Sequence, residues 1–449
     1  MQEYIGGVFS TASKSDYRIN LTKNITNELN SAEYSSRSEV DRDGVLKRVR
    51  TLTTNHLIVM IINFKTSIQR ELDKFFKELS GADFNIRTVT KSAFTKARAK
   101  LNPWAFKRLN EVVIDTFYAD APYHTWNGKR LLAVDGTRLI LPDHPSIIKK
   151  FGQHEFGPKA DSKRSLALGS ALYDVLNLVV IDSQIAPYAG SERDLLMEHL
   201  PKIKSGDLLL LDRGYPCFWL LFLLTAMKVD FCVRLKEDWW LSVKDFSESG
   251  ETERIVKFKL PKKDFSKLSD YPAIQATEIS CRLVKVLLDT GEVEILCTSL
   301  TDQKEYPHQV FKELYHQRWT EEEGYKLFKS RIEVERFSGK TALAVEQDFH
   351  AKIFLMTLTA AYAHPIEQRV VAEYKASEHR KHSQKINRTN ALSVTQNILI
   401  AMFFKKTIKK MLVAFDDLVY KTREIIRPGR SNPRKHRQKK PYGMNYKPL

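Results

Sequence analysis

The chain has 449 residues, of which 43% are hydrophobic and 10% aromatic, so it can bury a large core and is not disordered throughout. Its formal net charge of +18 predicts a polyanionic partner. Nucleic acid is the commonest such partner for a protein of this size, and a membrane surface is the alternative.

No targeting or membrane-spanning segment is expected. The N-terminus lacks the basic start and apolar run of a signal peptide. The most apolar stretch, YPCFWLLFLLTAM at 215–227, falls short of the roughly 18 residues that a spanning helix needs, which predicts a buried helix. The four cysteines have no CxxC spacing, so they favour a reducing compartment over disulfides or structural zinc. We therefore expect a cytoplasmic, nucleoid-associated protein.

Residues 1–125 are expected to form a helical N-terminal DNA-binding region. Apolar spacing predicts one helix over 55–79 and two shorter helices over 88–118. The first of these two shorter helices presents the basic residues Lys91, Lys96, Arg98 and Lys100. They would suit the reading helix of a helix-turn-helix protein, and a merely solvated basic face explains them equally well.

Two apolar runs are each interrupted by an aspartate. KRLLAVDGTRLIL at 129–141 contains Asp135, and GDLLLLDRGY at 206–215 contains Asp212. A carboxylate is out of place in a buried strand unless it has a chemical role. Taken singly, each aspartate also has a plain alternative as a residue at a strand end or a turn.

The elements around these two runs predict the fold. Residues 165–185 read as two strands, 191–203 as a helix, 217–228 as the buried helix and 229–235 as a strand. The order strand, hairpin, helix, strand, helix, strand is that of the ribonuclease H-like fold, an α/β mixed sheet flanked by helices. In that sheet the first strand lies beside the strand that follows the first helix, so the two aspartates would be neighbours.

Neighbouring carboxylates need a positive charge between them. Two of them about 4 Å apart repel by roughly 4 kcal/mol at an effective dielectric constant of about 20. Two Mg²⁺ ions, with about +4, would balance about −3 from three carboxylates and about −1 from a scissile phosphate. The pair of aspartates therefore predicts a site for metal ions and phosphate.

YHQRWTEEEGYKLFK at 315–329 is predicted to be one helix. At about 100° per residue, one face of that helix carries Tyr315, Arg318, Glu322 and Lys329. Glu321 and Glu323 would point elsewhere, as contacts with solvent. The alternative for the whole face is a solvated one with ordinary ion pairs.

LLAVDGTRL, LLLLDRGY and the order Tyr, two residues, Arg, three residues, Glu, six residues, Lys resemble the DDE transposases of the insertion-sequence-4 family. The resemblance covers about 130–350. It implies cut-and-paste transposition of DNA, in which Asp135, Asp212 and Glu322 are the catalytic residues. These three would be the ligands of two Mg²⁺ ions, with Mn²⁺ as a substitute.

The same resemblance implies the DNA contacts. Tyr315, Arg318 and Lys329 would hold phosphates near the cleaved end, and Trp319 would stack on DNA or simply pack. Trp239 would hold a base flipped out of the duplex, with packing as its alternative. The implied partners are the terminal inverted repeats and target DNA, bound by a homodimer on paired ends.

Five regions follow from these assignments. The N-terminal region would precede a catalytic core at 126–236 and 304–376, interrupted by a β-rich insertion at 237–303. A helical region at 377–426 is a candidate dimerisation element, and the basic tail at 427–449 is expected to be disordered and to bind DNA. The alternatives are a nuclease of the same fold that does not join strands, and a catalytically silent DNA-binding relative.

Overall fold

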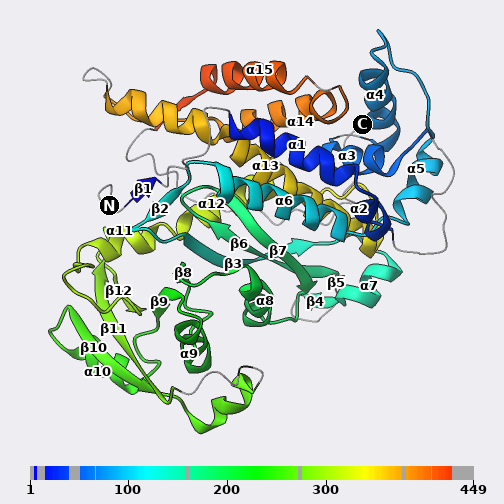
Figure 1. Cartoon of the computed structure of the whole chain (residues 1–449). Coiled ribbons are helices and arrows are strands. Elements are labelled where there is room, and N and C mark those ends of the chain that lie inside the picture. The colour runs from blue at the N-terminus through cyan, green and yellow to red at the C-terminus, as the bar shows by residue number, and fades with distance from the viewer. Residues whose placement is uncertain are drawn as a thin grey trace. The chain divides into compact units, whose positions relative to one another are not determined.

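The structure, a computed structural model, describes residues 5–7, 16–39, 51–65, 67–156, 162–269, 271, 276–376, 381–405 and 407–426 (Figure 1). The predicted tail at 427–449 lies outside these residues. Two compact units make up the chain, Met1–Phe9 with Pro122–Thr137 and Leu168–Tyr325, and Ser10–Ala121 with Arg138–Ala167 and Lys326–Leu449. None of the helices in the described part of the chain is long and apolar enough to cross a bilayer.

The first unit is built on an eight-stranded sheet in the order β10-β11-β12-β9-β8-β3-β6-β7, whose outer strands are labelled in Figure 1. The strands are β3 (Leu131–Ile140), β6 (Leu166–Asp174), β7 (Val179–Pro187), β8 (Leu208–Leu211), β9 (Asp230–Leu235), β10 (Glu253–Lys259), β11 (Glu278–Leu287) and β12 (Val293–Thr298). Their leucines, valines and isoleucines fill the core, and β8 is buried at all four positions. A two-stranded ribbon, β1 (Ile5–Gly7) with β2 (His124–Trp126), also belongs to this unit.

Five of the strands have the predicted ribonuclease H-like arrangement. Strand β8 pairs in parallel with both β3 and β9. Strand β6 runs antiparallel to β3, because Val175 N–H donates to Leu131 O at one end and Leu141 N–H to Ser165 O at the other. The sheet is therefore mixed, and the first strand lies beside the strand that follows the first helix, as the order of elements predicted.

The predicted insertion at 237–303 contributes strands to the same sheet. It contains α10 (Leu241–Glu248) and the antiparallel strands β10, β11 and β12, and β12 pairs with β9. Its β-rich character is as predicted. The added strands continue the sheet beyond β9 instead of forming a separate layer (Figure 1).

Two helices of this unit follow the sequence pattern closely. Helix α8 (Glu192–His199) begins at Ser191, whose hydroxyl accepts from Arg193 N–H. Helix α9 (Phe218–Ala226) is the apolar segment, and it is a core helix. Each follows a strand of the sheet, α8 after β7 and α9 after β8.

The prediction of a single helix over 315–329 is wrong in one respect, because the segment belongs to two helices. Helix α11 (Val310–His316) ends before α12 (Trp319–Ser330) begins. Around Gln317 and Arg318 each N–H bonds three residues back, and the Glu321 N–H donates to Arg318 O at 3.1 Å. A turn of this kind advances about 120° per residue instead of about 100°, so the faces of the two helices are offset.

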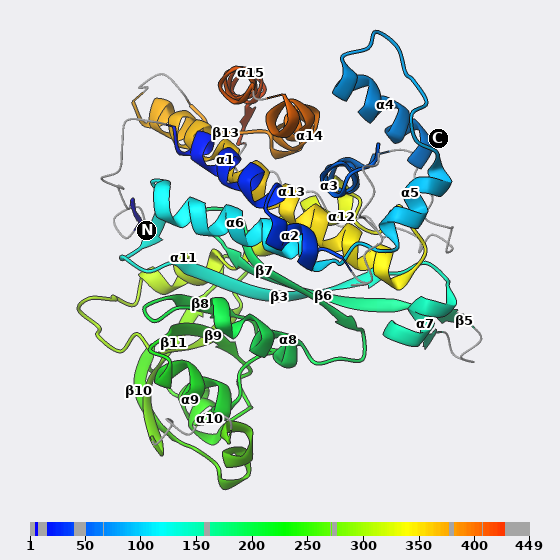
Figure 2. The same cartoon turned by 45° about the vertical axis from the view of Figure 1, so that its right-hand side comes forward.

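The second unit is largely helical. Its helices are α1 (Tyr17–Leu29), α2 (Ala32–Arg37), α3 (Thr54–Asn63), α4 (Ile68–Ser80), α5 (Lys91–Arg98), α6 (Trp104–Asp120), α7 (Pro145–Phe151), α13 (Ala342–Lys375), α14 (Arg388–Phe404) and α15 (Ile408–Lys421). The long helix α13 contacts α3, α6, α14 and α15, and Figure 2 shows it running through this group. Short strand pairs complete the unit: β4 (His154–Phe156) with β5 (Ser162–Arg164), and β13 (Gln384–Lys385) with β14 (Glu424–Ile425).

The single helix predicted over 55–79 is also two helices, α3 and α4. Phe64 leaves the helical conformation at φ −57° and ψ 121° and is buried, with its ring 5.3 Å from that of Phe94. Burial of this aromatic ring accompanies the break. Helix α4 ends at Gly81, which has φ 72°, a conformation that glycine adopts without strain.

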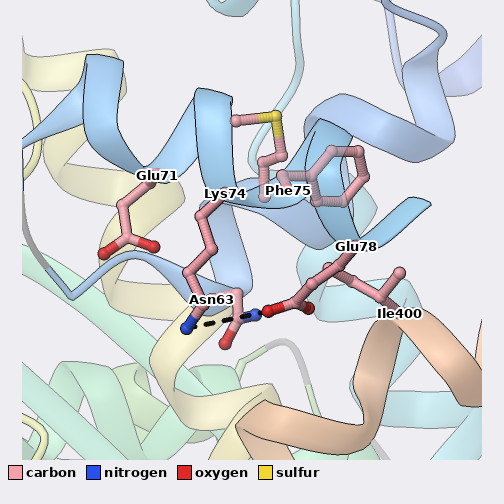
Figure 3. A pocket seen from close by; sticks show the side chains of 7 residues that line it. Asn63, Glu71, Lys74, Phe75, Glu78 and Ile400 are labelled. Carbon is pink, nitrogen blue, oxygen red and sulfur yellow. Dashed lines mark ion pairs between the residues drawn. The ribbon is translucent and has the colours of Figure 1, made fainter. Parts of the chain in front are cut away.

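A small cavity lies beside α3 and α4 (Figure 3). Its volume is about 10 Å³, which is room for about one water molecule. Lys74 Nζ and Glu78 Oε1, 3.8 Å apart, flank it, and Asn63 Oδ1 is buried there without a partner among the described residues. A single water would satisfy Asn63, so this cavity is not a ligand pocket.

Candidate active site

Asp135 and Asp212 occupy adjacent positions on neighbouring parallel strands. The register pairs Val134 of β3 with Leu211, the last residue of β8, so Asp135 is the next residue of β3 and Asp212 directly follows β8. Parallel strands lie about 4.8 Å apart, so the two aspartates start from neighbouring backbone positions. The prediction that they are neighbours is confirmed.

The first of these carboxylates is held in an electrostatically unfavourable place. Burial, together with the charges of Glu192 and Asp212, raises the pKa of Asp135 to about 6, although the Gly136 N–H and the Arg318 guanidinium act to lower it. The Gly136 N–H donates to Asp135 Oδ1 at 2.8 Å. Asp212 Oδ1 is buried and has no hydrogen-bond partner among the described residues.

Helix α12 supplies the backbone partners of Asp135. The Asp135 N–H donates to Glu321 Oε1 at 2.9 Å, and the Tyr325 hydroxyl donates to Asp135 O at 2.7 Å. The pairing of β3 with β8 ends at Val134, one residue earlier. Two side chains one helical turn apart therefore hold the Asp135 main chain where the pairing of β3 with β8 ends.

The expectation that Glu321 contacts solvent is wrong. Glu321 is 2% exposed, and burial together with the charge of Asp135 raises the pKa of its carboxyl well above the usual range. The tightened turn at Gln317 and Arg318 is the physical reason, because it rotates α12 relative to a regular helix that starts before Tyr315. Glu323 is exposed, as predicted.

Arg318 lies between the first aspartate and Glu322. Its Nη2 is 3.1 Å from Glu322 Oε1 and its Nη1 is 3.9 Å from Asp135 Oδ2, while its own side chain is 4% exposed. Burial opposes the charge of the guanidinium, but the charges around it, including Asp212 and Asp135, raise the pKa of Arg318 overall. The guanidinium thus supplies positive charge in the middle of the acidic residues.

The remaining predicted residues of this segment differ in exposure. Tyr315 is 3% exposed, and its hydroxyl donates to Leu211 O at 3.3 Å, so it supports the strand that leads into Asp212. Trp319 is 45% exposed, with the Arg318 guanidinium 5.3 Å from its ring centre. Lys329 belongs to the second unit, where its Nζ donates to Arg138 O at 2.7 Å and burial lowers its pKa.

The predicted basic face of α5 is only partly a surface. Lys91 and Lys96 are exposed. The prediction that Arg98 lies on an exposed, DNA-binding face is wrong. Arg98 is 5% exposed, and its Nη2 lies 2.8 Å from Asp348 Oδ1. Its guanidinium also donates to Gln347 Oε1 and to Ala344 O, so Arg98 fixes α5 to α13.

Trp239 is half-buried at the start of the predicted insertion. Its ring stacks on Trp240 at 6.1 Å and 11°, and Lys236 Nζ lies 5.7 Å from the ring centre. Arg213 and Lys236 line a hollow of about 490 Å³ that includes the last residues of β9. The lining also includes Glu237, Asp238 and Glu294, so the structure places Trp239 in an aromatic stack near a hollow of mixed charge.

Glu192 was missed by the sequence analysis, which treated the start of α8 only as a helix cap. A methyl group at Gly136 would clash with Glu192 Oε1 and lie 3.0 Å from Glu192 Cδ, and one at Gly214 would lie 3.4 Å from Glu192 Oε2. Burial and the charge of Asp212 raise the pKa of Glu192. The available signal was a glycine close behind each aspartate, which leaves room for another side chain.

The donor set fits a hard divalent cation. Carboxylate oxygens are the ligands that Mg²⁺ and Mn²⁺ prefer, and the buried, unpartnered Asp212 Oδ1 is an oxygen that such an ion would satisfy. Among the described residues no three acidic, histidine or cysteine side chains already converge as a metal-ligating group. Glu322 faces Arg318 instead, so the guanidinium provides charge balance in this arrangement.

Comparisons with known proteins identify a family for this chain. A family described as the transposase DDE domain matches residues 126–358. The transposase InsG of insertion sequence element IS4 from Escherichia coli K12 is 24% identical over 70% of this chain and 71% of its own length. A putative transposase, InsZ, from the same organism is 22% identical over 37% of this chain and 55% of its own.

Among solved structures, the piggyBac transposase synaptic complex with hairpin DNA aligns over 92% of this chain and 87% of that chain, at 12% identity and a TM-score of 0.45.

Proposed function

Because the chain belongs to the DDE transposases, we propose that it cleaves DNA at the ends of an insertion sequence and joins the freed 3′ ends to target DNA. The observation that carries this proposal is the register of Val134 with Leu211, which makes Asp135 and Asp212 adjacent. Glu322 on α12 is the third carboxylate, linked to Asp135 through Arg318. The signature residues and the fold therefore support the same reaction.

DDE transposases generally use divalent metal ions, and we assign Asp135, Asp212 and Glu322 as the ligands of two Mg²⁺ ions, which Mn²⁺ can replace. When bound, such ions activate a water molecule or a 3′-hydroxyl and stabilise the charge that develops on the phosphate. The chain's own part is to hold Asp135 through Glu321 and Tyr325. No covalent intermediate between protein and DNA is required.

The DNA contacts are assigned by charge and exposure. The exposed Trp319 ring beside the Arg318 guanidinium suits a base or sugar next to the scissile phosphate. The exposed Lys91 and Lys96 suit contacts with DNA phosphates. The resemblance to the family also assigns DNA contacts to Tyr315, Lys329 and Trp239, and these remain predictions. For Tyr315 such a contact requires the phenol to give up its hydrogen bond with Leu211 O.

The DNA partners would be terminal inverted repeats and a target duplex, bound by two copies of the chain on paired ends. Support for an interface comes from α15, which exposes Val413 at 70% and Leu418 at 49%. The excess of basic residues suits a protein that acts on nucleoid DNA.

The test is Mg²⁺-dependent nicking and joining of labelled DNA that carries the inverted repeats flanking the reading frame. We expect both steps to require a divalent ion and to be lost in Asp212→Asn. A protein that binds these ends but neither nicks nor joins them across a Mg²⁺ and Mn²⁺ titration would contradict the proposal.

The alternative enzymatic function is a nuclease of the same fold that does not join strands. Pre-cleaved ends with a free 3′-hydroxyl separate the two, because a transposase joins them to a target plasmid and a nuclease leaves them unjoined.

A further inference from the structure

Helix α8 carries an acidic side chain to the two strand ends of the active site. Glu192 is its first residue, and the carboxylate lies against both glycines that follow the aspartates: a methyl group at Gly136 would clash with it, and one at Gly214 would be 3.4 Å from Oε2. Both glycines thus leave room for this carboxylate.

Glu192 is not required there as a helix cap. Ser191 already accepts from Arg193 N–H at 3.2 Å. The Glu192 carboxylate has no hydrogen-bond or ion-pair partner among the described residues, although it is half-buried and close enough to Asp212 to be affected by its charge. A partly buried carboxylate without a partner beside like charges costs free energy, which points to a role with a cation.

A second observation comes from Tyr215, three residues after Asp212. Tyr215 is 1% exposed, and its hydroxyl is buried without a hydrogen-bond partner among the described residues. Burial raises the pKa of Tyr215, and the charges of nearby carboxylates, first Glu192 and then Asp135, raise it as well. An unsatisfied hydroxyl therefore lies among the same acidic groups, where a hydrated cation would supply its missing partner.

The other end of α8 is fixed in the core of the unit. His199 Nδ1 lies 2.7 Å from Asp182 Oδ2, and His199 Nε2 lies 3.0 Å from Ser170 Oγ. All three residues are buried, so Ser170 is not available to a substrate and the chain of hydrogen bonds is structural. It anchors α8 to β6 and β7 and thereby sets the position of Glu192.

We propose that Glu192 is a fourth carboxylate of the divalent-metal site, acting with Asp135, Asp212 and Glu322. This inference rests on the proposed metal-dependent transposition. With Glu192, the carboxylates and a scissile phosphate carry about five negative charges, which two divalent ions and Arg318 balance with about five positive ones. Without Glu192 the assembled site would carry an excess of about one positive charge.

The test measures Mn²⁺ binding to the full chain by electron paramagnetic resonance and by the rise in Tm that Mn²⁺ causes. Four proteins are compared: the unmodified chain, Glu192→Gln, Asp135→Asn, and Glu323→Gln as the matched exposed control. We expect the first two variants each to weaken Mn²⁺ binding by about 10-fold or more and the control to leave it unchanged. Without metal, Glu192→Gln should unfold at the same or a higher temperature, because a like charge has been removed.

The outcomes separate the two proposals. If Asp135→Asn weakens Mn²⁺ binding and Glu192→Gln does not, the fourth ligand is overturned and the proposed function stands. If neither variant changes binding, or the unmodified chain binds no Mn²⁺, the proposed function fails as well. A Glu192→Gln variant that unfolds at a clearly lower temperature without metal would make Glu192 structural and would overturn the inference.

Gly136→Ala tests the geometry independently. Its methyl group should push the Glu192 carboxylate away and weaken Mn²⁺ binding in the unmodified background. In a Glu192→Ala background the same methyl group should cause no further loss. Additive losses in the two backgrounds would contradict the proposed position of Glu192.

Discussion

The strand pair β3–β8 and the helix α12 position their acidic residues by different means. On the strands, backbone pairing of Val134 with Leu211 makes Asp135 and Asp212 neighbours whatever their side chains are. Such a site depends on the sheet, whose strand β8 is buried at every position. Isosteric changes of these aspartates should therefore alter the chemistry and leave the fold intact.

On α12 the acidic residues depend on where the helix begins. The tightened turn before Trp319 turns Glu321 toward the Asp135 N–H and leaves Glu322 to pair with Arg318. The neighbouring glutamates thus have different roles: Glu321 is buried against the Asp135 main chain, and Glu322 lies at the active site. Strand pairing thus places the aspartates whatever their side chains are, whereas one tightened turn before a helix changes which side chains that helix presents to the site.

The largest expected effect comes from replacing Glu322 on α12, and the adjacent Glu323 provides the comparison. Glu322→Gln should lower DNA cleavage and joining by more than about 10⁴-fold, the scale on which single catalytic groups act, while binding to labelled ends persists. Glu323→Gln, on the exposed face, should change neither. Equal losses in the two variants, measured by single-turnover nicking, would show that α12 does not present Glu322 to the site.

On α5, too, a side chain that was predicted to lie on an exposed face makes a buried contact, because Arg98 pairs with Asp348. Arg98→Met should destabilise the protein by about 3 to 5 kcal/mol, because it leaves Asp348 buried without its cation. The measurement is the midpoint of urea unfolding. Lys96→Met, an exposed position on the same helix, is the control and should leave that midpoint nearly unchanged.

Glu321 provides a smaller effect that isolates its contact with the Asp135 main chain. Glu321→Ala should cost about 1 to 3 kcal/mol, because the Asp135 N–H loses its acceptor inside the protein. Glu321→Gln keeps an oxygen acceptor of the same size and should retain most of the stability and the activity. Comparing urea midpoints and nicking rates of the two variants checks this, and equal damage in both would mean that the charge of Glu321 matters.

The smallest expected effect concerns the exposed lysines of α5. Replacing Lys91 or Lys96 by Ala should reduce the slope of log affinity for DNA against log salt by about 0.9 each, without changing stability. Lys421, which pairs with Asp417 on α15, provides the control. Salt titrations that give the unmodified slope for both α5 variants would remove this helix from the DNA interface.

Much of the fold was predictable because it depends on local patterns. The apolar runs that end at Asp135 and Asp212 are strands, and Ser191 begins a helix as predicted. The breaks at Phe64 and at Gln317 were not predictable from apolar spacing, because each segment keeps helical periodicity on both sides of its break. A contact made elsewhere in the protein, such as that of Phe64 with Phe94, has no signal in the segment itself.

The sequence by itself determined which residues are catalytic candidates and the order of the elements that carry them. The chain order of the strands follows from the order of the apolar runs, and the likeness of that order to the ribonuclease H-like fold predicted the adjacency of Asp135 and Asp212 that the register shows. The tertiary structure alone decided what each helical side chain faces: Glu321 on the Asp135 main chain, Arg98 on Asp348, and Glu192 between two glycines. The physical reason is that periodicity fixes the angles within a helix, whereas its rotation about its own axis is set by contacts with residues far away in the chain.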